Sequence, residues 1–446
     1  MPSRDRQEFL QQAKKRWELG RQADKGQRDR ERADLKAYSG DTWSQADIAA
    51  RQPVNATAGL PPMPGRPTLK IPLLREPIKQ VTNQERQSEL GVELVPADDF
   101  AGLVGSYDQS EIELREGLVR RLQRESEAAD ARTWAFDRAV KCGRGFYYVT
   151  TRYLPGQTWD QEIAIERIFN QESVTLDPAH EQPDGSDCEW EFITNDYVPF
   201  EIYRKTWRKN ADGESNPITT ETFQSFQDGD PNWFKTEGDL KYVRVTDYYY
   251  KEYEARTLVQ LADGQTAWKD ELPKDGSVEV IDERRVLEPS VKWCKLDGIQ
   301  ILEETDWPSP HLPIVKILAE EMQPYDGERR AEGMVRPAAD SNMGFNAMLS
   351  KGVELIGLAP IPPLMIAEGQ VEGYEAWYQA ASTRTLPYLP YKTKDLEGNI
   401  VGAPQRTPVD TPIAAVATFM QVFRDTLQST TLVHDPTLGR ASSDVK

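Results

Sequence analysis

Two groups of carboxylates are the residues of this chain whose types and spacing are best suited to chemistry. The first group comprises Asp184, Asp187 and Glu189. The second comprises Glu303, Glu304 and Asp306. Closely spaced carboxylates can hold a divalent cation, and such a site would support metal-dependent cleavage of DNA. The same residues are also typical of solvated acidic turns, and this second interpretation is the one we favour for both groups.

Other signatures of catalysis are missing from the sequence. It contains no GxxxxGK[ST] phosphate loop, no GxGxxG before a helix, and no CxxC, HExxH or GxSxG motif. The histidines lie far apart, and each is expected to pack or to face solvent: His180, His311 and His434. The cysteines are odd in number and widely separated, which fits a reducing compartment: Cys142, Cys188 and Cys294. We therefore predict that the chain is no enzyme and uses no cofactor and no metal.

The composition describes an acidic, folded chain. Its 446 residues allow about three domains. Asp and Glu number 73 against 54 Lys and Arg, giving a net charge of −19, which argues against a protein that grips nucleic acid over its whole surface. The most apolar segment, residues 355–367, contains three prolines and is too short for a membrane span. The N-terminal stretch lacks the apolar core of a signal peptide, and we expect no membrane partner.

Periodicity predicts helices mainly towards the two ends of the chain. Residues 1–36 carry 11 basic and 7 acidic side chains and predict one or two exposed helices. These helices could pack on the body of the protein, or form an arm that meets a neighbouring subunit or nucleic acid. Further helices are expected in residues 77–87, 110–141, 197–209, 333–357, 374–381 and 411–428, the last with Thr411 and Pro412 as its start.

Strand signals dominate the middle of the sequence. A hairpin is expected from residues 143–154 and 161–168, and single strands from 91–97 and 364–367. Residues 241–318 predict a compact β-rich module, with turns at Asp263-Gly264 and Asp297-Gly298 and a last strand at 312–318.

Several stretches, taken together, resemble the portal proteins of tailed bacteriophages, specifically the podovirus-type portal family. They occur in order over nearly the whole chain: Asp34–Asp47, Pro72–Gln87, the succession from Cys142 to Phe192, Val291–Ile317, Gly333–Ile356, and residues 430–446. None of them is catalytic, so the resemblance depends on their order and spacing. Members of this family usually continue with more helix beyond the last of these stretches.

The resemblance implies a ring of about twelve identical subunits at one capsid vertex of the virion, assembled in the host cytoplasm. Double-stranded DNA would pass through the ring during genome packaging and ejection. The implied partners are the large terminase subunit, head-to-tail adaptor proteins, and the major capsid and scaffolding proteins. The implied fold is α+β, with a mixed wing, a β-rich clip, a helical stem and a tunnel-loop region.

The resemblance also assigns segments to these parts. Residues 1–60 would be a basic helical segment of the wing, 61–240 the wing body, 241–320 the clip, 321–358 a stem helix, 359–373 the tunnel-loop region, and 374–446 the returning wing and crown-proximal helices. The tunnel-loop candidates are Pro360, Ile361, Pro362 and Pro363.

A few basic residues could centre DNA in such a channel. The candidates are Arg329, Arg330, Arg336 and Lys351. Ion pairing within or between subunits is the alternative role for them. Aromatic anchors for the ring interface could be Trp207, Trp233, Trp268, Trp293 and Trp307, although each is also a candidate for the core.

Two other functions remain open at this point. The chain could be a different virion component, such as a minor capsid or scaffold-type protein, which would form no twelve-fold ring. It could also be a metal-dependent DNA-processing enzyme that uses the acidic group around Asp187.

Overall fold

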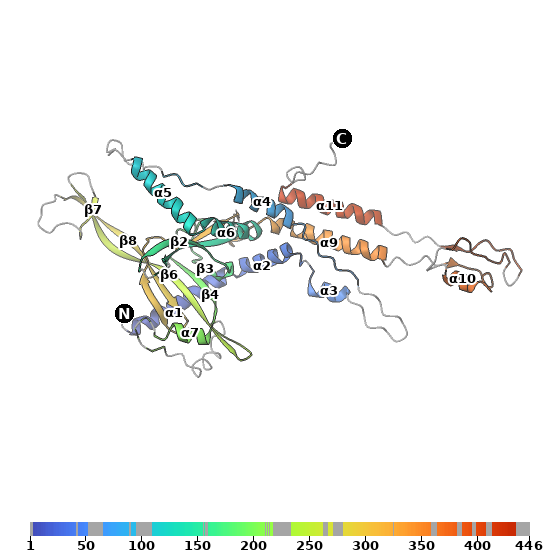
Figure 1. Ribbon diagram of the computed structural model, residues 1–446, viewed down its shortest axis with the longest axis horizontal. Helices are drawn as coiled ribbons and strands as arrows, with labels where there is room; N and C mark the ends of the chain where they lie inside the picture. The colour runs from blue at the N-terminus through green and yellow to red at the C-terminus, as the bar shows by residue number, and fades with distance from the viewer. Residues whose placement is uncertain are drawn as a thin grey trace. The chain divides into compact units, whose positions relative to one another are not determined.

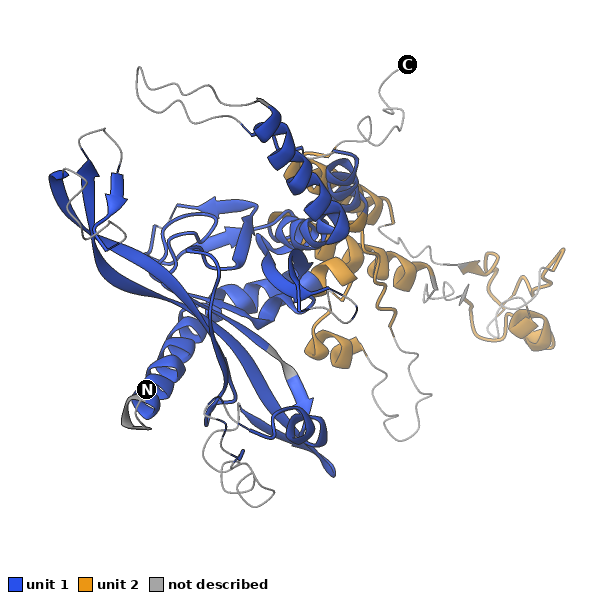
Figure 2. Cartoon of the chain, turned by 60° about the vertical axis from the view of Figure 1, so that its left-hand side comes forward, with its two compact units in different colours: residues 1–35, 76–336 blue, residues 36–75, 337–446 orange. Residues whose placement is uncertain are grey.

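The computed structural model divides the chain into two compact units (Figure 2). Unit 1 contains residues 1–35 and 76–336, and unit 2 contains residues 36–75 and 337–446. The structure describes residues 3–41, 43–51, 66–88, 91–94, 109–154, 156, 159–209, 211, 213, 215–216, 233–261, 266–270, 280–323, 325–357, 364–380, 386–394, 398–406 and 413–433.

Unit 1 begins with two helices that pack on the protein body. They are α1 (Ser3–Ala23) and α2 (Lys25–Ser39), whose last residues enter unit 2. Ala13 and Trp17 of α1 are buried among core aromatics, and Trp17 Nε1 donates a hydrogen bond to Thr194 Oγ1 at 3.1 Å. The prediction of helices at 1–36 is confirmed, but their description as exposed is wrong along this face. An apolar stripe that includes a tryptophan gains free energy by leaving water.

A seven-stranded antiparallel sheet forms the centre of unit 1 (Figure 1). Its main path runs through β3 (Val174–Leu176), β4 (Trp190–Pro199), β6 (Leu240–Leu261), β8 (Val280–Leu296) and β9 (Ile301–Asp306). Two short strands, β5 (Phe234–Glu237) and β7 (Thr266–Trp268), pair with β6.

The predicted module at 241–318 is confirmed as β-rich, but it is not self-contained. Strand β6 pairs with β4, from Trp190↔Tyr250 to Pro199↔Tyr242, and so joins an earlier part of the chain. The turn at Asp297-Gly298 is confirmed, since β8 and β9 pair on either side of Gly298, whose φ is +83°. The turn at Asp263-Gly264 lies outside the described residues.

A second, three-stranded sheet has the order β10-β1-β2. The predicted hairpin is confirmed as β1 (Arg144–Tyr153) and β2 (Gln161–Arg167), and the predicted last strand as β10 (Ile314–Leu318). Helices α5 (Gln109–Glu125) and α6 (Ala128–Cys142) confirm the helical prediction for 110–141. A Cβ on Gly145 would lie 1.9 Å from the Ala135 carbonyl oxygen, so only glycine allows β1 to approach α6 this closely.

Short elements complete unit 1. They are η1 (Gln171–Ser173), α7 (Phe200–Thr206), and the paired strands β11 (Glu320–Met322) and β12 (Arg330–Glu332). Helix α4 (Arg75–Gln87) confirms the prediction for 77–87. The strand predicted at 91–97 is wrong for residues 91–94, which form no strand, and its remaining residues lie outside the described part.

Aromatic side chains dominate the larger core of unit 1. Tyr248 and Phe192 face each other across β6 and β4 and stack with their ring centroids 4.3 Å apart. Tyr203 of α7 is also fully buried in this cluster. A smaller cluster, around Phe146 and Tyr249, lies between the two sheets. Large aromatic rings of this kind supply much of the apolar area that leaves water on folding.

Unit 2 is mainly helical. It contains α3 (Gln45–Arg51), most of α9 (Val335–Gly357), α10 (Glu375–Ala380) and α11 (Ile413–Thr431), with β13 (Leu364–Met365) paired to β14 (Gln405–Arg406). These bounds confirm the helices predicted at 333–357, 374–381 and 411–428, although Thr411 and Pro412 are not described. The strand predicted at 364–367 is limited to its first two residues.

Polar side chains of α9 hold an extended segment of unit 2. Asn346 exchanges two hydrogen bonds with the backbone of Ile71, at 2.8 and 3.1 Å, and Ser350 Oγ accepts from Leu69 N at 2.9 Å. Gly344 of the same helix lies against the Phe423 ring of α11, where a Cβ would come within 2.5 Å. None of the helices in the described part of the chain is long and apolar enough to span a membrane.

Candidate functional site

The three arginines predicted for a channel lie close together in sequence, around β12 and the start of α9. Arg329 Nε is 3.2 Å from Glu321 Oε1 of β11. Arg330 pairs with Asp326 and Glu328, and its guanidinium lies 4.8 Å from the Tyr325 ring centroid. Each guanidinium therefore has a carboxylate of its own chain beside it.

Arg336, in the first turn of α9, connects this segment to α2. Its Nη2 lies 3.0 Å from Asp34 Oδ1 and donates a hydrogen bond to the Arg30 carbonyl at 2.6 Å. Burial raises the pKa of Asp34 to about 6, even though the Arg336 charge acts in the opposite direction. The carboxyl is therefore mostly ionised at neutral pH, but its ionisation is less favourable than in water.

Lys351, the fourth predicted residue, lies in the later half of α9 in unit 2. Its Nζ is 3.3 Å from Glu354 Oε1. The same glutamate also meets Arg51 at 3.4 Å and Arg66 at 3.5 Å. Three basic side chains thus share one carboxylate, so this part of unit 2 carries excess positive charge.

All four basic residues therefore form ion pairs with carboxylates of the same chain. Their side chains are not all withdrawn from water, since Lys351 is 48% exposed and Arg329 is 39% exposed. The tunnel-loop candidates Pro360, Ile361, Pro362 and Pro363 lie outside the described residues, so the structure places none of them.

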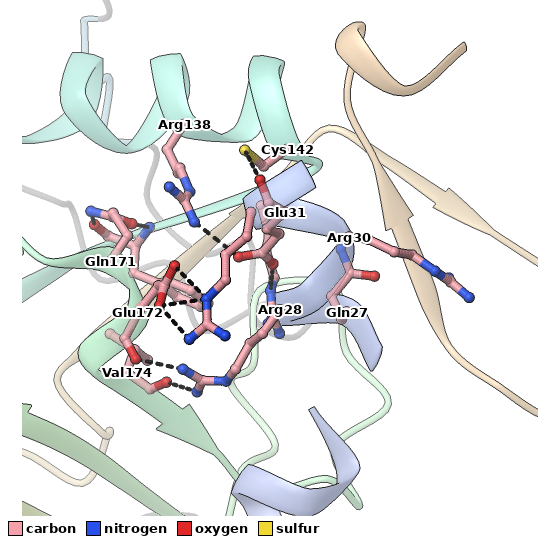
Figure 3. A network of polar contacts seen from close by, with 12 residues as sticks. Gln27, Arg28, Arg30, Glu31, Arg138, Cys142, Gln171, Glu172 and Val174 are labelled. Atoms are coloured by element: carbon pink, nitrogen blue, oxygen red, sulfur yellow. Dashed lines mark hydrogen bonds and ion pairs between the residues drawn. The ribbon is translucent and has the colours of Figure 1, made fainter. Parts of the chain in front are cut away.

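Sequence reasoning missed a buried polar network that holds α2 on the body of unit 1. Arg28 donates to the Glu172 and Val174 carbonyls, both at 2.5 Å, and Figure 3 shows its guanidinium pointing at this segment. Glu31 accepts from Arg138 at 3.1 Å and from Arg144 at 2.6 Å. Burial lowers the pKa of Arg28 to about 10, which still leaves it charged at neutral pH.

The network continues to the junction of α1 and α2 through Arg144, the first residue of β1. Its two terminal nitrogens donate to both carboxylate oxygens of Asp24, at 2.7 and 2.8 Å. Burial alone would raise the pKa of Asp24, but the Arg144 charge holds it below its usual value. The available sequence signal was the spacing of Asp24, Arg28 and Glu31, which places three charged residues on one helix face.

The acidic groups suggested as metal sites have separate structural roles. Asp187 accepts hydrogen bonds from the backbone of Glu181 and Gln182, and Asp184 accepts one from Ser186 N. Glu189 accepts from the Tyr253 hydroxyl at 2.6 Å. Within the described residues, no three Asp, Glu, His or Cys side chains converge as metal ligands would.

The second acidic group is divided in the same way. Glu303 accepts from Trp207 Nε1 at 2.6 Å, Asp306 pairs with Lys292, and Glu304 is 3.9 Å from Arg6. These contacts are typical of a half-exposed sheet surface.

The three cysteines are buried. Burial lowers the reactivity of their thiols, as two of them illustrate. Burial raises the pKa of both Cys142 and Cys294 to about 12, so the thiolate is scarce at neutral pH. His180 contacts Lys316 and the Asp177 carbonyl, whereas His434 is not described.

The tryptophans suggested as ring anchors all make contacts inside unit 1. Trp233 is 4% exposed in the core, and Trp307 packs edge-on against Tyr249. Trp293 Nε1 donates to Asp247 Oδ1 at 3.1 Å, and Trp268 lies beneath the Arg256 guanidinium at 4.4 Å. Of these tryptophans, Trp233 therefore fits best the alternative role of a residue of the hydrophobic core.

One comparison with known proteins gives a match. The family model described as phage P22-like portal protein matches residues 14–445. No curated protein matches the sequence.

Proposed function

The chain belongs to the family of phage P22-like portal proteins, and on this premise we propose that it is the subunit of a ring of about twelve copies. The ring would occupy one vertex of the capsid and serve as the conduit for genome packaging and ejection. The observation that carries this proposal is the family match, which extends over residues 14–445.

The net charge of the chain favours a role as a passage for DNA over a role as a tight DNA-binding protein. Twelve copies at −19 each give about −228 for the ring. Because binding to DNA is driven largely by cations that neutralise phosphates, an acidic wall lets the duplex slide. A few basic side chains would then centre it, and the exposed ends of Arg329 and Lys351 are suited to this role.

Six parts of the chain receive proposed roles. Residues 1–60 would be a basic helical segment of the wing, and residues 61–240 the wing body. The β-rich stretch 241–320 would be the clip, α9 a stem helix, and residues 359–373 the tunnel-loop region. Residues 374–446 would return towards the wing.

The ribbon formed by β6 and β8 supports the clip assignment. Beyond Glu252↔Ser290 these strands continue as a pair to Gln260↔Asp282, and Tyr253, Ile281 and Leu287 are exposed on them. Exposed apolar residues on a protruding ribbon are suited to contact other proteins. The proposed partners are the large terminase subunit and the head-to-tail adaptors, together with the major capsid and scaffolding proteins around the ring.

Sedimentation velocity over a concentration series tests the oligomeric part of the proposal. Twelve copies of the 50.7 kDa chain give a particle of about 608 kDa. The fraction of protein in this particle should increase with concentration, and it should be the largest closed species. A closed dimer at every concentration would contradict the ring and favour a different role in the virion.

A further inference from the structure

Unit 1 contains a cavity of about 520 Å³. Its wall includes the channel candidate Arg329, but most of its lining residues are neither channel candidates nor part of the hydrophobic core. It is bordered by the first turn of α2, by β10, and by residues 327–331 that lead into β12. Its lining includes five basic residues and four acidic ones: Lys25, Arg30, Arg144, Lys316 and Arg329, and Asp24, Asp177, Glu321 and Glu328.

Lys316 is the unusual residue of this wall. It lies in the middle of β10, opposite Phe146 of β1, and is 7% exposed. Its Nζ is 3.2 Å from His180 Nε2. His180 Nδ1 faces the Asp177 carbonyl, which can only accept, so Nδ1 carries the proton and Nε2 accepts from the lysine. The ammonium group keeps two N–H donors that meet no acceptor among the residues described here.

Three other basic side chains of the wall pair with carboxylates. Arg144 pairs with Asp24 at 2.7 Å, and Arg329 with Glu321 at 3.2 Å. Arg30 lies 3.6 Å from Glu328. The Asp177 carboxylate accepts backbone hydrogen bonds from Ala179 and, at 3.4 Å, from Glu189.

Lys316 therefore contributes a buried positive charge that no carboxylate in the described part of the chain offsets within 4.0 Å. A buried charge without a partner is costly unless something neutralises it. Burial lowers the pKa of Lys316, and the charges of Arg144 and Arg329 lower it further. Glu321 raises this pKa, so the positive potential at the lysine nitrogen is offset in part, although by none of the described carboxylates within 4.0 Å.

The start of α2 adds to this potential. Lys25, Gly26 and Gln27, the first three residues of this 15-residue helix, line the cavity. The N-terminal end of a helix carries partial positive charge and is a frequent site for phosphate-type anions. A side chain added at Gly26 would meet no atom within 4 Å, so open space adjoins this turn.

We propose that this cavity binds a small tetrahedral oxyanion of the phosphate class, held by Lys316 with support from Arg329 and the first turn of α2. An anion with acceptors in several directions can meet donors that arrive from three separate elements. Bound there, it would connect β10 and the segment before β12 to the N-terminal helices. This inference does not depend on the ring, although it shares Arg329 with the proposed channel.

Inorganic phosphate is the probe for the first test, with the full-length chain at constant ionic strength and chloride as the reference anion. Isothermal titration calorimetry and thermal unfolding are measured on the wild type, on Lys316→Met, and on Lys269→Met. Lys269 is a matched control, because it directly follows β7, forms an exposed pair with Glu283 and lies outside the cavity.

We expect saturable binding and a rise in melting temperature for the wild type and for the control. Lys316→Met should bind phosphate about tenfold more weakly or worse, because a charge-assisted contact is lost. Without phosphate this variant should be at least as stable as the wild type, since it no longer buries an unmatched charge. Phosphate should then reverse the order of the two melting temperatures.

Two further arms keep the test decisive. If Lys316→Met fails to fold, Arg329→Gln replaces it and should also weaken binding. A short oligonucleotide with a 5′-phosphate, compared with the same oligonucleotide without it, distinguishes a phosphate at a chain end from the free ion as the source. No saturable binding of phosphate to the wild type, or equal binding by the wild type and both variants, would overturn the proposal.

Discussion

Arg144 and Asp24 form a two-pronged ion pair, with both terminal nitrogens of the arginine on both oxygens of the aspartate at 2.7 and 2.8 Å. The pair joins the start of β1 to the junction of α1 and α2, residues that lie 120 positions apart. Because Arg144 also meets Glu31, one guanidinium pairs with two carboxylates on one face of the N-terminal helices.

Replacing Arg144 with methionine should therefore destabilise unit 1 strongly. The change leaves Asp24 without its strongest partner and removes one of the two arginines from Glu31, and breaking a buried pair in this way costs about 3–5 kcal/mol. Urea denaturation followed by tryptophan fluorescence measures the change. Arg121→Met is the control, because its pair with Glu125 is exposed and should contribute little to stability. Equal losses for the two variants would refute this role of Arg144.

The contact of β1 with α6 gives a second prediction. Gly145→Ala places a methyl group 1.9 Å from the Ala135 carbonyl oxygen, so strand and helix must move apart, at a cost of about 1–3 kcal/mol or more. Gly117→Ala in α5 meets no atom within 4 Å and should instead stabilise by about 0.5–1 kcal/mol. Chemical denaturation compares both with the wild type. The prediction fails if Gly145→Ala is neutral.

Glu191 predicts a dependence of stability on pH. It is fully buried in β4, one of its oxygens accepts from Ile314 N at 3.2 Å, and burial raises its pKa well above the usual value. When folding raises the pKa of a carboxyl group, the contribution of that group to the free energy of unfolding is fully present below its unfolded pKa, near 4.5. This contribution is lost as the pH rises towards the folded pKa. Glu191 should thus cause the stability of the wild type to decline above about pH 4.5, by at most about 1.4 kcal/mol per pH unit.

Glu191→Gln isolates this contribution. The variant should match the wild type near pH 4 and exceed it increasingly towards pH 8, because glutamine has no proton to lose. Denaturant midpoints at four or five pH values measure the difference, and Glu254→Gln, at an exposed position of β6, serves as the control. A constant difference between Glu191→Gln and wild type across this range would contradict the account.

The proposed channel role of Lys351 can be tested on assembled rings. Binding of a short duplex is measured over a range of salt concentrations for the wild type, Lys351→Gln and Lys269→Gln. Loss of a phosphate contact should weaken binding and reduce the slope of log affinity against log salt by about 0.9 per contact. The Lys269 control should keep the wild-type slope. A slope that Lys351→Gln leaves unchanged would assign this lysine to its ion pair with Glu354 alone.

The elements that sequence predicted well are those with local signals. The apolar spacing of residues 333–357 corresponds to α9, and the alternation of residues 143–168 corresponds to β1 and β2. The module predicted at 241–318 is not self-contained, because strand pairing depends on distant parts of the chain. Nothing in the sequence of β6 alone indicates that Trp190 of β4 will lie opposite Tyr250.

The candidate site was predicted less completely than the fold. The resemblance to portal proteins suggested which basic residues could meet DNA, but carboxylate partners such as Asp34 for Arg336 come from distant parts of the chain. Lys316 was overlooked, although a lysine in the centre of the apolar run IVKIL is itself a signal. Lys316 shares the more buried face of β10 with Ile314, and a charge on such a face requires a partner or a ligand.

The central claim is that this chain forms the ring of a phage portal, and cryo electron microscopy of the purified protein tests it most directly. Class averages viewed down the particle axis should show about twelve-fold symmetry around a central hole wide enough for duplex DNA. Open filaments or closed dimers at the concentrations where particles form would contradict the claim.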